Sequence, residues 1–110
     1  MDQANFFPDW RALVRCAVPR TEPAMLVDVD GFRALVAGLE PGDEIPDHLE
    51  RLAVYHVLEG KGEMIVDDNL FALTAGATVI AGRGSCRGIK ALTRLAFLAV
   101  RIGPELEDAS

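Results

Sequence analysis

His48 and Glu50 are the first residues in this chain whose types and spacing could do chemistry. They stand two residues apart in the segment PGDEIPDHLERLAVYHVLEG, residues 41–60, which also holds the second histidine, His56. On a β-strand, side chains two residues apart point to the same side, so the imidazole and the carboxylate would share one environment. Such a pair could ligate a divalent metal with water completing the shell, or it could line a polar pocket that holds no metal.

Cys86 is a second candidate for chemistry. It lies beside Arg87, with Arg83 and Lys90 close in the sequence, and neighbouring cations make a thiol more reactive. Strand alternation would turn Cys86 away from Arg87. We therefore expect a small buried hydrophobe at this position, with a redox cysteine as the alternative. Cys16, the other cysteine, is expected in the core.

The composition limits the function classes that these residues can serve. The chain has 110 residues and a net charge of −6, and we expect a single domain, residues 1–110. Such an acidic protein is a poor binder of nucleic acid phosphates and of anionic membranes. No signal peptide is visible, and no apolar run reaches the roughly 20 residues that span a bilayer. With two cysteines and no export signal, we expect reduced thiols and a cytoplasmic location.

The elements that must position the candidate residues are short apolar runs separated by turn residues. The breaks are rich in Gly, Asp and Asn, which tolerate the positive φ of tight turns. Short, evenly spaced strands without a βαβ rhythm predict an all-β sandwich or barrel. The N-terminal segment, residues 1–23, is expected to be helical or irregular, with a short helix within residues 8–16. Residues 104–110 form an acidic tail.

Several of the predicted strands are apolar on both faces. The run LAFLAV, residues 95–100, has no polar alternation before Arg101. One face of such a strand can fill a barrel, but the other face must be covered by a second sheet or a second subunit. We therefore expect a two-fold homodimer, the commonest closed symmetry.

Two glycine-punctuated motifs in the chain resemble those of the cupin family, which has the patterns G-x5-H-x-H-x(3,4)-E-x6-G and G-x5-P-x-G-x2-H-x3-N. The first motif begins at Gly42 and ends at Gly60, and the second begins at Gly76. The segment YHVLEGKGEMIVDDNLFALTAGATVIAGRG, residues 55–84, runs from the first motif into the second and looks like the motif-to-motif core of that family. The resemblance covers about residues 32–102 and implies a small cupin β-barrel, or jelly roll, with that core.

The same resemblance implies where a divalent metal would bind inside the barrel, but the ligand set is degenerate. His48 occupies the first histidine position, whereas Glu50 occupies the second. The glutamate position, counted back from Gly60, is Ala53, and the last histidine position is Arg87. Alanine offers no side-chain ligand, and the always-protonated arginine brings a positive charge to the place of a cation. No metal cofactor is therefore expected, and any metal would depend on His48 and Glu50.

The resemblance also brings Glu50 and Arg87 together inside the barrel. A buried charge without a partner is costly, so we expect the two side chains to pair. The pair could orient a small polar or anionic ligand, or it could be a structural ion pair that closes the barrel. Tyr55, two residues beyond Ala53, should also point inward, as a pocket residue or as a core tyrosine with a satisfied hydroxyl. His56 should face away from the pocket.

Three hypotheses for the function follow. The first is a metal-free module that binds or senses a small molecule in a pocket lined by His48, Glu50, Tyr55 and Arg87. The second is a metal-dependent oxygenase or isomerase that uses His48 and Glu50. The third is a structural or interaction dimer with an occluded barrel. The sequence names no substrate.

Overall fold

The computed structural model describes residues 4–14 and 23–104, and nearly all of its regular structure is β-strand. In the N-terminal range there is one turn of 3-10 helix, η1 (Trp10–Ala12), whose first turn is capped by Asp9 through a 3.0 Å bond from the Arg11 amide to its carboxylate. The short helix predicted within residues 8–16 is thus a single turn in its described part. Within the described ranges no helix has the length and apolar character needed to cross a membrane. Cys16 and the acidic tail beyond Pro104 lie outside the described residues.

Residues 23–104 contain nine strands, and turns or short loops connect them. In chain order they are β1 (Ala24–Val29), β2 (Phe32–Leu39), β3 (Glu44–Leu49), β4 (Leu52–Glu59), β5 (Lys61–Val66), β6 (Asn69–Thr74), β7 (Thr78–Ala81), β8 (Cys86–Ala91) and β9 (Leu95–Ile102).

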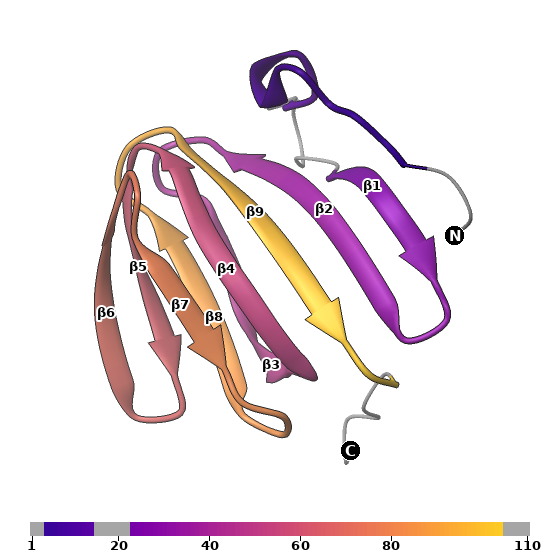
Figure 1. The fold of residues 1–110 in the computed structure, drawn as a ribbon. Helices are drawn as coiled ribbons and strands as arrows, with labels where there is room; N and C mark the ends of the chain where they lie inside the picture. Colours follow the sequence, from indigo (N-terminus) through magenta and orange to yellow (C-terminus); the bar gives the residue numbers. More distant parts are fainter. Residues whose placement is uncertain (1–3, 15–22, 105–110) are drawn as a thin grey trace.

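The strands form two antiparallel sheets that face each other (Figure 1). Sheet A has the order β1-β2-β9-β4-β7, and sheet B has the order β3-β8-β5-β6. Neighbours such as β2 and β9 are far apart in the sequence, so the chain crosses repeatedly between the sheets rather than forming a simple meander. The predicted fold class, an all-β jelly roll with a short N-terminal helical or irregular segment, is confirmed.

Gly60, which ends the first motif, is required by close packing of the backbone. Its φ is 93°, a region that disfavours residues with a Cβ. A Cβ placed on it would lie 1.8 Å from the carbonyl oxygen of Arg94, in the loop that leads into β9. The turn between β4 and β5 thus touches the start of β9, and only glycine fits there.

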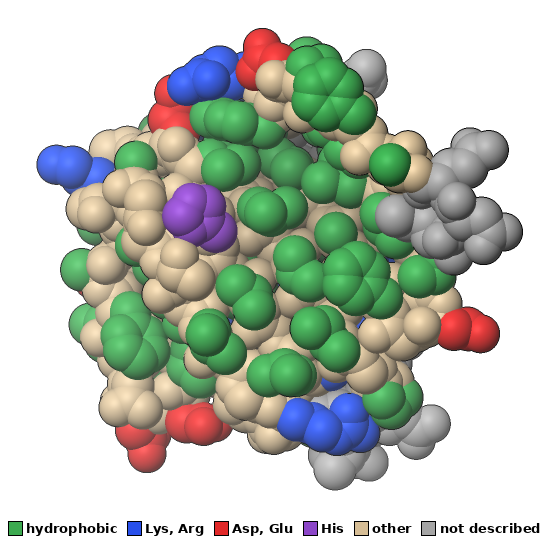
Figure 2. Space-filling model, in the orientation of Figure 1, with side chains coloured by type: hydrophobic (Ala, Val, Ile, Leu, Met, Phe, Trp, Pro, Cys, Tyr) green, Lys and Arg blue, Asp and Glu red, His purple; other side chains and the backbone are tan. Residues whose placement is uncertain are grey.

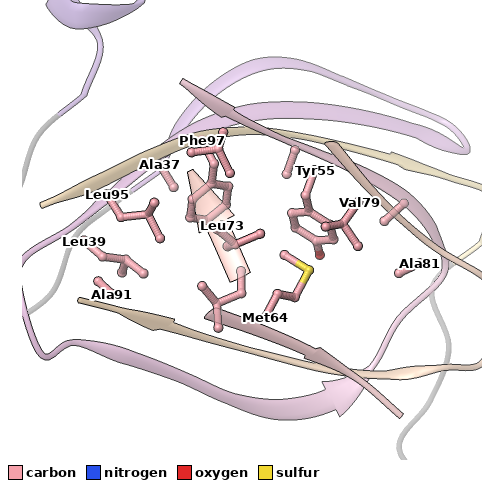
Figure 3. Packing of buried hydrophobic residues seen from close by; sticks show 14 of the residues in the cluster. Ala37, Leu39, Tyr55, Met64, Leu73, Val79, Ala81, Ala91, Leu95 and Phe97 are labelled. Carbon is pink, nitrogen blue, oxygen red and sulfur yellow. The ribbon is translucent and has the colours of Figure 1, made fainter. Parts of the chain in front are cut away.

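Alternate residues of each strand fill the space between the sheets. In β4 the side chains of Ala53, Tyr55 and Val57 are buried, whereas their neighbours are half-buried or exposed. Figure 3 shows Tyr55, Met64, Leu73 and Val79 pointing into the same interior from both sheets. This period of two explains why short apolar runs, and not long helices, build the core.

The opposite side of sheet A is apolar as well. Strand register places three rows of side chains across this face, and they come from all five strands. We call them the outer face of sheet A: Val27, Val29, Phe32, Ala34, Val36, Leu52, Val54, His56, Thr78, Ile80, Leu98, Val100 and Ile102. Hydrophobic side chains gather on the face that Figure 2 presents. Ile80 is 67 % exposed there, an unusual state for a strand isoleucine.

Candidate functional site

The strand pair β3–β8 brings the first two site residues together. His48 in β3 lies directly opposite Arg87 in β8 in the strand register. Glu50 follows the end of β3, and its backbone is held by a bond from its amide to the Ser85 carbonyl and by one from the Gly84 amide to its own carbonyl, each 2.8 Å. The carboxylate is thereby fixed between the sheets, although Glu50 belongs to no strand.

Glu50 is the centre of a buried polar cluster. Its side chain is 3 % exposed and that of Arg87 is 1 % exposed. The Glu50 Oε2 atom accepts hydrogen bonds from Arg87 Nη2 at 2.8 Å, from Arg87 Nε at 3.3 Å and from the hydroxyl of Tyr55. The Arg87 guanidinium also lies over the Tyr55 ring, 5.0 Å from its centroid. The predicted convergence of Glu50, Tyr55 and Arg87 is therefore present.

Arg101 is a fourth member of the cluster that the sequence reasoning missed. Its Nε atom lies 3.4 Å from Glu50 Oε1, and its side chain is 22 % exposed. Arg101 in β9 is the register partner of Ala53 in β4, so the two side chains share one face of sheet A. The small methyl group of Ala53 leaves room beside it for the guanidinium. Arg101 continues the inward alternation of Phe97 and Ala99, but the sequence did not reveal this parity because residues 95–100 are apolar on both faces.

The two ring nitrogens of His48 have different partners. Its Nε2 atom lies 2.8 Å from Arg87 Nη2, and its Nδ1 atom lies 3.2 Å from the carbonyl oxygen of Pro46. A guanidinium only donates, so Nε2 must be the acceptor, and Nδ1 then carries the proton that it donates to Pro46. The Nε2 lone pair is the one that would ligate a metal in the cavity, and Arg87 already uses it.

The cluster shifts the titration of its two acids in opposite directions. Burial alone would raise the pKa of Glu50, but the hydrogen bonds from Tyr55 and Arg87 and the charges of Arg101 and Arg87 together lower it. Burial raises the pKa of Tyr55 to about 12, and the bond to the Glu50 carboxylate contributes to that shift, while the Arg87 charge opposes it. At neutral pH the site therefore holds a carboxylate, a neutral phenol and two guanidinium groups.

A cavity of about 400 Å³ opens between the two sheets next to this cluster. Of the four residues predicted to line a pocket, Tyr55 and Arg87 form part of its polar lining together with Arg101, whereas His48 and Glu50 do not line it. Most of the remaining wall is apolar and comes from β2, β9 and the strand pair β3–β8: Leu35, Ala37, Leu39, Ile45, Ile89 and Phe97. The barrel interior is thus not completely filled by its own side chains.

The donor set does not fit a divalent metal. No group of three or more His, Cys, Asp or Glu side chains in residues 4–14 and 23–104 is arranged to hold one. His48 and Glu50 direct their lone pairs at Arg87, and Ala53 has none to offer. Two permanent positive charges, from Arg87 and Arg101, stand where the motif resemblance places the cation.

The other predicted positions have mixed outcomes. His56 faces away from the cavity, as expected, and its Nδ1 atom lies 2.8 Å from Thr78 Oγ1 on the outer face of sheet A. Cys86 does alternate away from Arg87, but the expectation that it is buried is wrong, since this free cysteine is exposed. It lies beside the hairpin between β5 and β6, where its amide donates to the Asp67 side chain at 3.0 Å.

Comparisons with known proteins identify the fold. The sequence matches no protein-family profile and no curated protein. A conserved protein of unknown function from Streptococcus pyogenes is similar in structure, with a TM-score of 0.81 at 22 % identity over 96 % of this chain and 93 % of that one. A cupin superfamily protein from Desulfitobacterium hafniense gives 0.81 at 14 % identity, over 94 % and 95 %.

A third solved structure leads to the same conclusion. It is an uncharacterized conserved protein with a double-stranded beta-helix domain from Klebsiella pneumoniae, with a TM-score of 0.83 at 20 % identity over 97 % of this chain and 96 % of that one. The agreement extends over nearly the whole length of each chain. The protein therefore has the small cupin fold that the two motifs predicted, and these likenesses speak to the fold alone.

Proposed function

We propose that this protein is a small-molecule binding or sensing module that uses the cavity inside its barrel and no metal. The observation that carries the proposal is the cavity of about 400 Å³, whose apolar wall ends at the buried cluster of Glu50, Tyr55, Arg87 and Arg101. Binding pockets for small molecules are typically of this size, mostly apolar, with a few convergent polar groups that orient the ligand.

A purely structural role for the barrel fits this interior less well. A structural ion pair needs only Glu50 and Arg87, and apolar side chains could have closed the space next to it. Instead, a second arginine, Arg101, reaches the same carboxylate and also lines the cavity. Burying an extra charge is costly, so its presence favours a role that uses it.

An oxygenase or isomerase that depends on His48 and Glu50 as metal ligands is disfavoured by their contacts. Both residues accept hydrogen bonds from Arg87, whose guanidinium would repel a cation. Elemental analysis of protein purified without a metal-affinity tag tests this part of the proposal. We expect far less than one zinc, iron, manganese or nickel per chain. A content near one per chain that His48→Ala abolishes would restore the enzyme hypothesis.

Binding itself can be tested with a fragment collection and NMR. We expect some fragments to shift the methyl resonances of Leu35, Leu39, Ile45 and Ile89, which line the cavity, in a saturable way. The variant Ala37→Phe should abolish these shifts, because it places a large ring in the cavity wall. Leu92→Phe is the matched control, since Leu92 is 53 % exposed and does not line the cavity. Absence of any fragment that meets both conditions would contradict the proposal.

Assembly is the second part of the proposal. The outer face of sheet A is a broad apolar surface, and its two polar side chains, His56 and Thr78, satisfy each other through a 2.8 Å contact. A face of this kind can be buried without leaving a polar group unpaired. We propose that a second copy of the chain covers it in a two-fold dimer, in which the same face meets itself.

The dimer is tested by sedimentation at micromolar concentration. The wild-type chain should sediment as a dimer, and Ile80→Asp should shift it to monomer by placing a charge at the most exposed isoleucine of the outer face. Ile65→Asp is the control on sheet B, since Ile65 is also exposed at 42 %. A monomeric wild type would refute this part.

The exposed thiol of Cys86 fits the reducing cytoplasm expected for the chain.

A further inference from the structure

The buried cluster has an uneven charge balance. Two guanidinium groups, Arg87 and Arg101, contact a single carboxylate, Glu50. His48 is neutral when it accepts from Arg87, so it adds no charge. One positive charge is thus left in excess at the end of the cavity, in a place where water screens it poorly.

Hydrogen-bond donors are left over at the same place. Arg87 uses Nε and Nη2 on Glu50 and His48, but its buried Nη1 atom donates to no acceptor among residues 4–14 and 23–104. The buried Nε atom of Arg101 is likewise without a hydrogen bond in that part of the chain. Both side chains line the cavity. The surrounding side chains bury both atoms, so the partly exposed Arg101 is the guanidinium that an acceptor in the cavity can reach.

The rest of the cavity lining indicates the chemistry of the remainder of the ligand that would carry such an acceptor. The wall formed by Leu35, Leu39 and Phe97 is apolar. At the other end of β3, about 13 Å along the strand from His48, the lining includes the acidic side chains of Asp43 and Glu44. Glu44 is exposed and paired with Lys90, but the half-buried carboxylate of Asp43 disfavours a second anionic group at this end.

We infer that the cavity binds a small organic monocarboxylate, whose carboxylate faces Arg101 and whose apolar body lies along β2 and β9. This inference rests on the proposed function and specifies its ligand class. A carboxylate supplies a single charge, which balances the excess, and two acceptor oxygens for the guanidinium group of Arg101. Glu50 then serves to position Arg87 rather than to bind the ligand.

The test compares two probes that differ in charge and hardly at all in shape. Hexanoate and hexanamide are titrated by calorimetry in a buffer free of chloride, at neutral pH. We expect one hexanoate per chain, bound at least about tenfold more tightly than the amide, because charge-assisted hydrogen bonds are the stronger ones. Arg101→Met should remove most of this preference, because it lowers the affinity for hexanoate more than the affinity for hexanamide.

Two control variants complete the design. Arg83→Met removes an exposed arginine that does not line the cavity, and it should change neither affinity. Arg101→Lys keeps the charge with a different geometry, and it should retain part of the preference for hexanoate if Arg101→Met fails to fold. The wild-type preference can be measured without any variant.

The failures of the two proposals are distinguishable. If hexanamide binds as tightly as hexanoate in the cavity, the carboxylate inference is overturned and the small-molecule function stands. If the hexanoate preference falls equally with Arg83→Met, it reflects general attraction to a basic surface, and the inference is also overturned. If no fragment and neither probe binds at millimolar concentration, both proposals fall.

Discussion

The two ends of the barrel interior are built from the same strands and filled in different ways. At one end, Leu73, Leu95 and Ala91 pack as an apolar core (Figure 3). At the other end, Glu50 and Arg87 are just as deeply buried but are held by hydrogen bonds and charge. The apolar end depends on the sum of many weak contacts, whereas the polar end depends on each partner being present.

This difference predicts how substitutions behave. In the apolar end a residue of similar volume can replace another, because dispersion contacts are not directional. In the polar end even an isosteric change removes a charge on which three other side chains depend. A residue in the polar end should therefore tolerate less change than one of equal burial in the apolar end.

The largest expected effect is the removal of one partner of the buried pair. Glu50→Ala or Arg87→Ala should lower the free energy of unfolding by about 3–5 kcal/mol, because the first leaves Arg87 buried without a countercharge and the second leaves the buried Glu50 with the longer Arg101 contact alone. The double variant Glu50→Gln with Arg87→Met should cost less than the sum of its two single changes. Urea denaturation of the four proteins in a double-mutant cycle measures the coupling. Strict additivity would mean that the two side chains do not interact.

Acid should lower the free energy of unfolding by protonating Glu50 at the polar end. The effect should be no larger than the stabilisation that the ionised carboxylate provides. The pKa of Glu50 is lowered on folding, so its ionised form stabilises the protein above the unfolded value of about 4.3. That stabilisation is lost as the pH falls through the lower, folded pKa. The difference in unfolding free energy between wild type and Glu50→Gln should thus shrink on acidification. A difference that stays constant from neutral pH to about pH 3 would contradict the lowered pKa.

A conservative change at the apolar end should cost less. Met64 is 1 % exposed, as deeply buried as Arg87, and it packs between the sheets near Tyr55. We expect Met64→Leu to lower the free energy of unfolding by less than about 1.5 kcal/mol, since the volume is conserved. Denaturation of Met64→Leu beside Glu50→Gln compares the two ends directly. An equal loss in both would remove the distinction between them.

The smallest expected effect comes from an ion pair on the same two strands as Arg87. Glu44 in β3 and Lys90 in β8 are register partners, with a 3.8 Å separation between Glu44 Oε1 and Lys90 Nζ, and both side chains are exposed. Lys90→Met should change the free energy of unfolding by less than about 1 kcal/mol, because solvent screens the pair. A cost near that of Arg87→Ala would show that burial does not account for the difference between the ends.

The strands could be predicted from the sequence, because turn residues and apolar runs are local signals. The convergence of Glu50 and Arg87, 37 residues apart, followed from the spacing of the second motif, which runs without interruption from Gly76 to Arg87. The first motif is less regular. The interval between Glu50 and Ala53 is one residue shorter than the pattern, and the structure accommodates it because the chain leaves β3 at Leu49 and enters β4 at Leu52.

Two features could not be predicted from the sequence: the inward position of Arg101 and the exposure of Cys86. In β9 both faces are apolar, so the pattern of residues 95–100 did not reveal which parity points inward, and Arg101 could not be placed. The register partner Ala53 on β4 decides its position, and that pairing is non-local. Cys86 is exposed because it begins β8 at the end of sheet B, where no strand covers its outward side.

The buried phenol of Tyr55 has a consequence for spectroscopy. The chain contains one tyrosine and one tryptophan, and Trp10 belongs to the N-terminal turn η1, outside the barrel strands. Any ultraviolet signal from tyrosinate therefore comes from the cavity alone. Its absorption should appear at about pH 12, rather than near the value of about 10 for a free phenol. The protein thus carries its own chromophore at the site, and an alkaline titration reads the state of the Glu50–Arg87 cluster without a label.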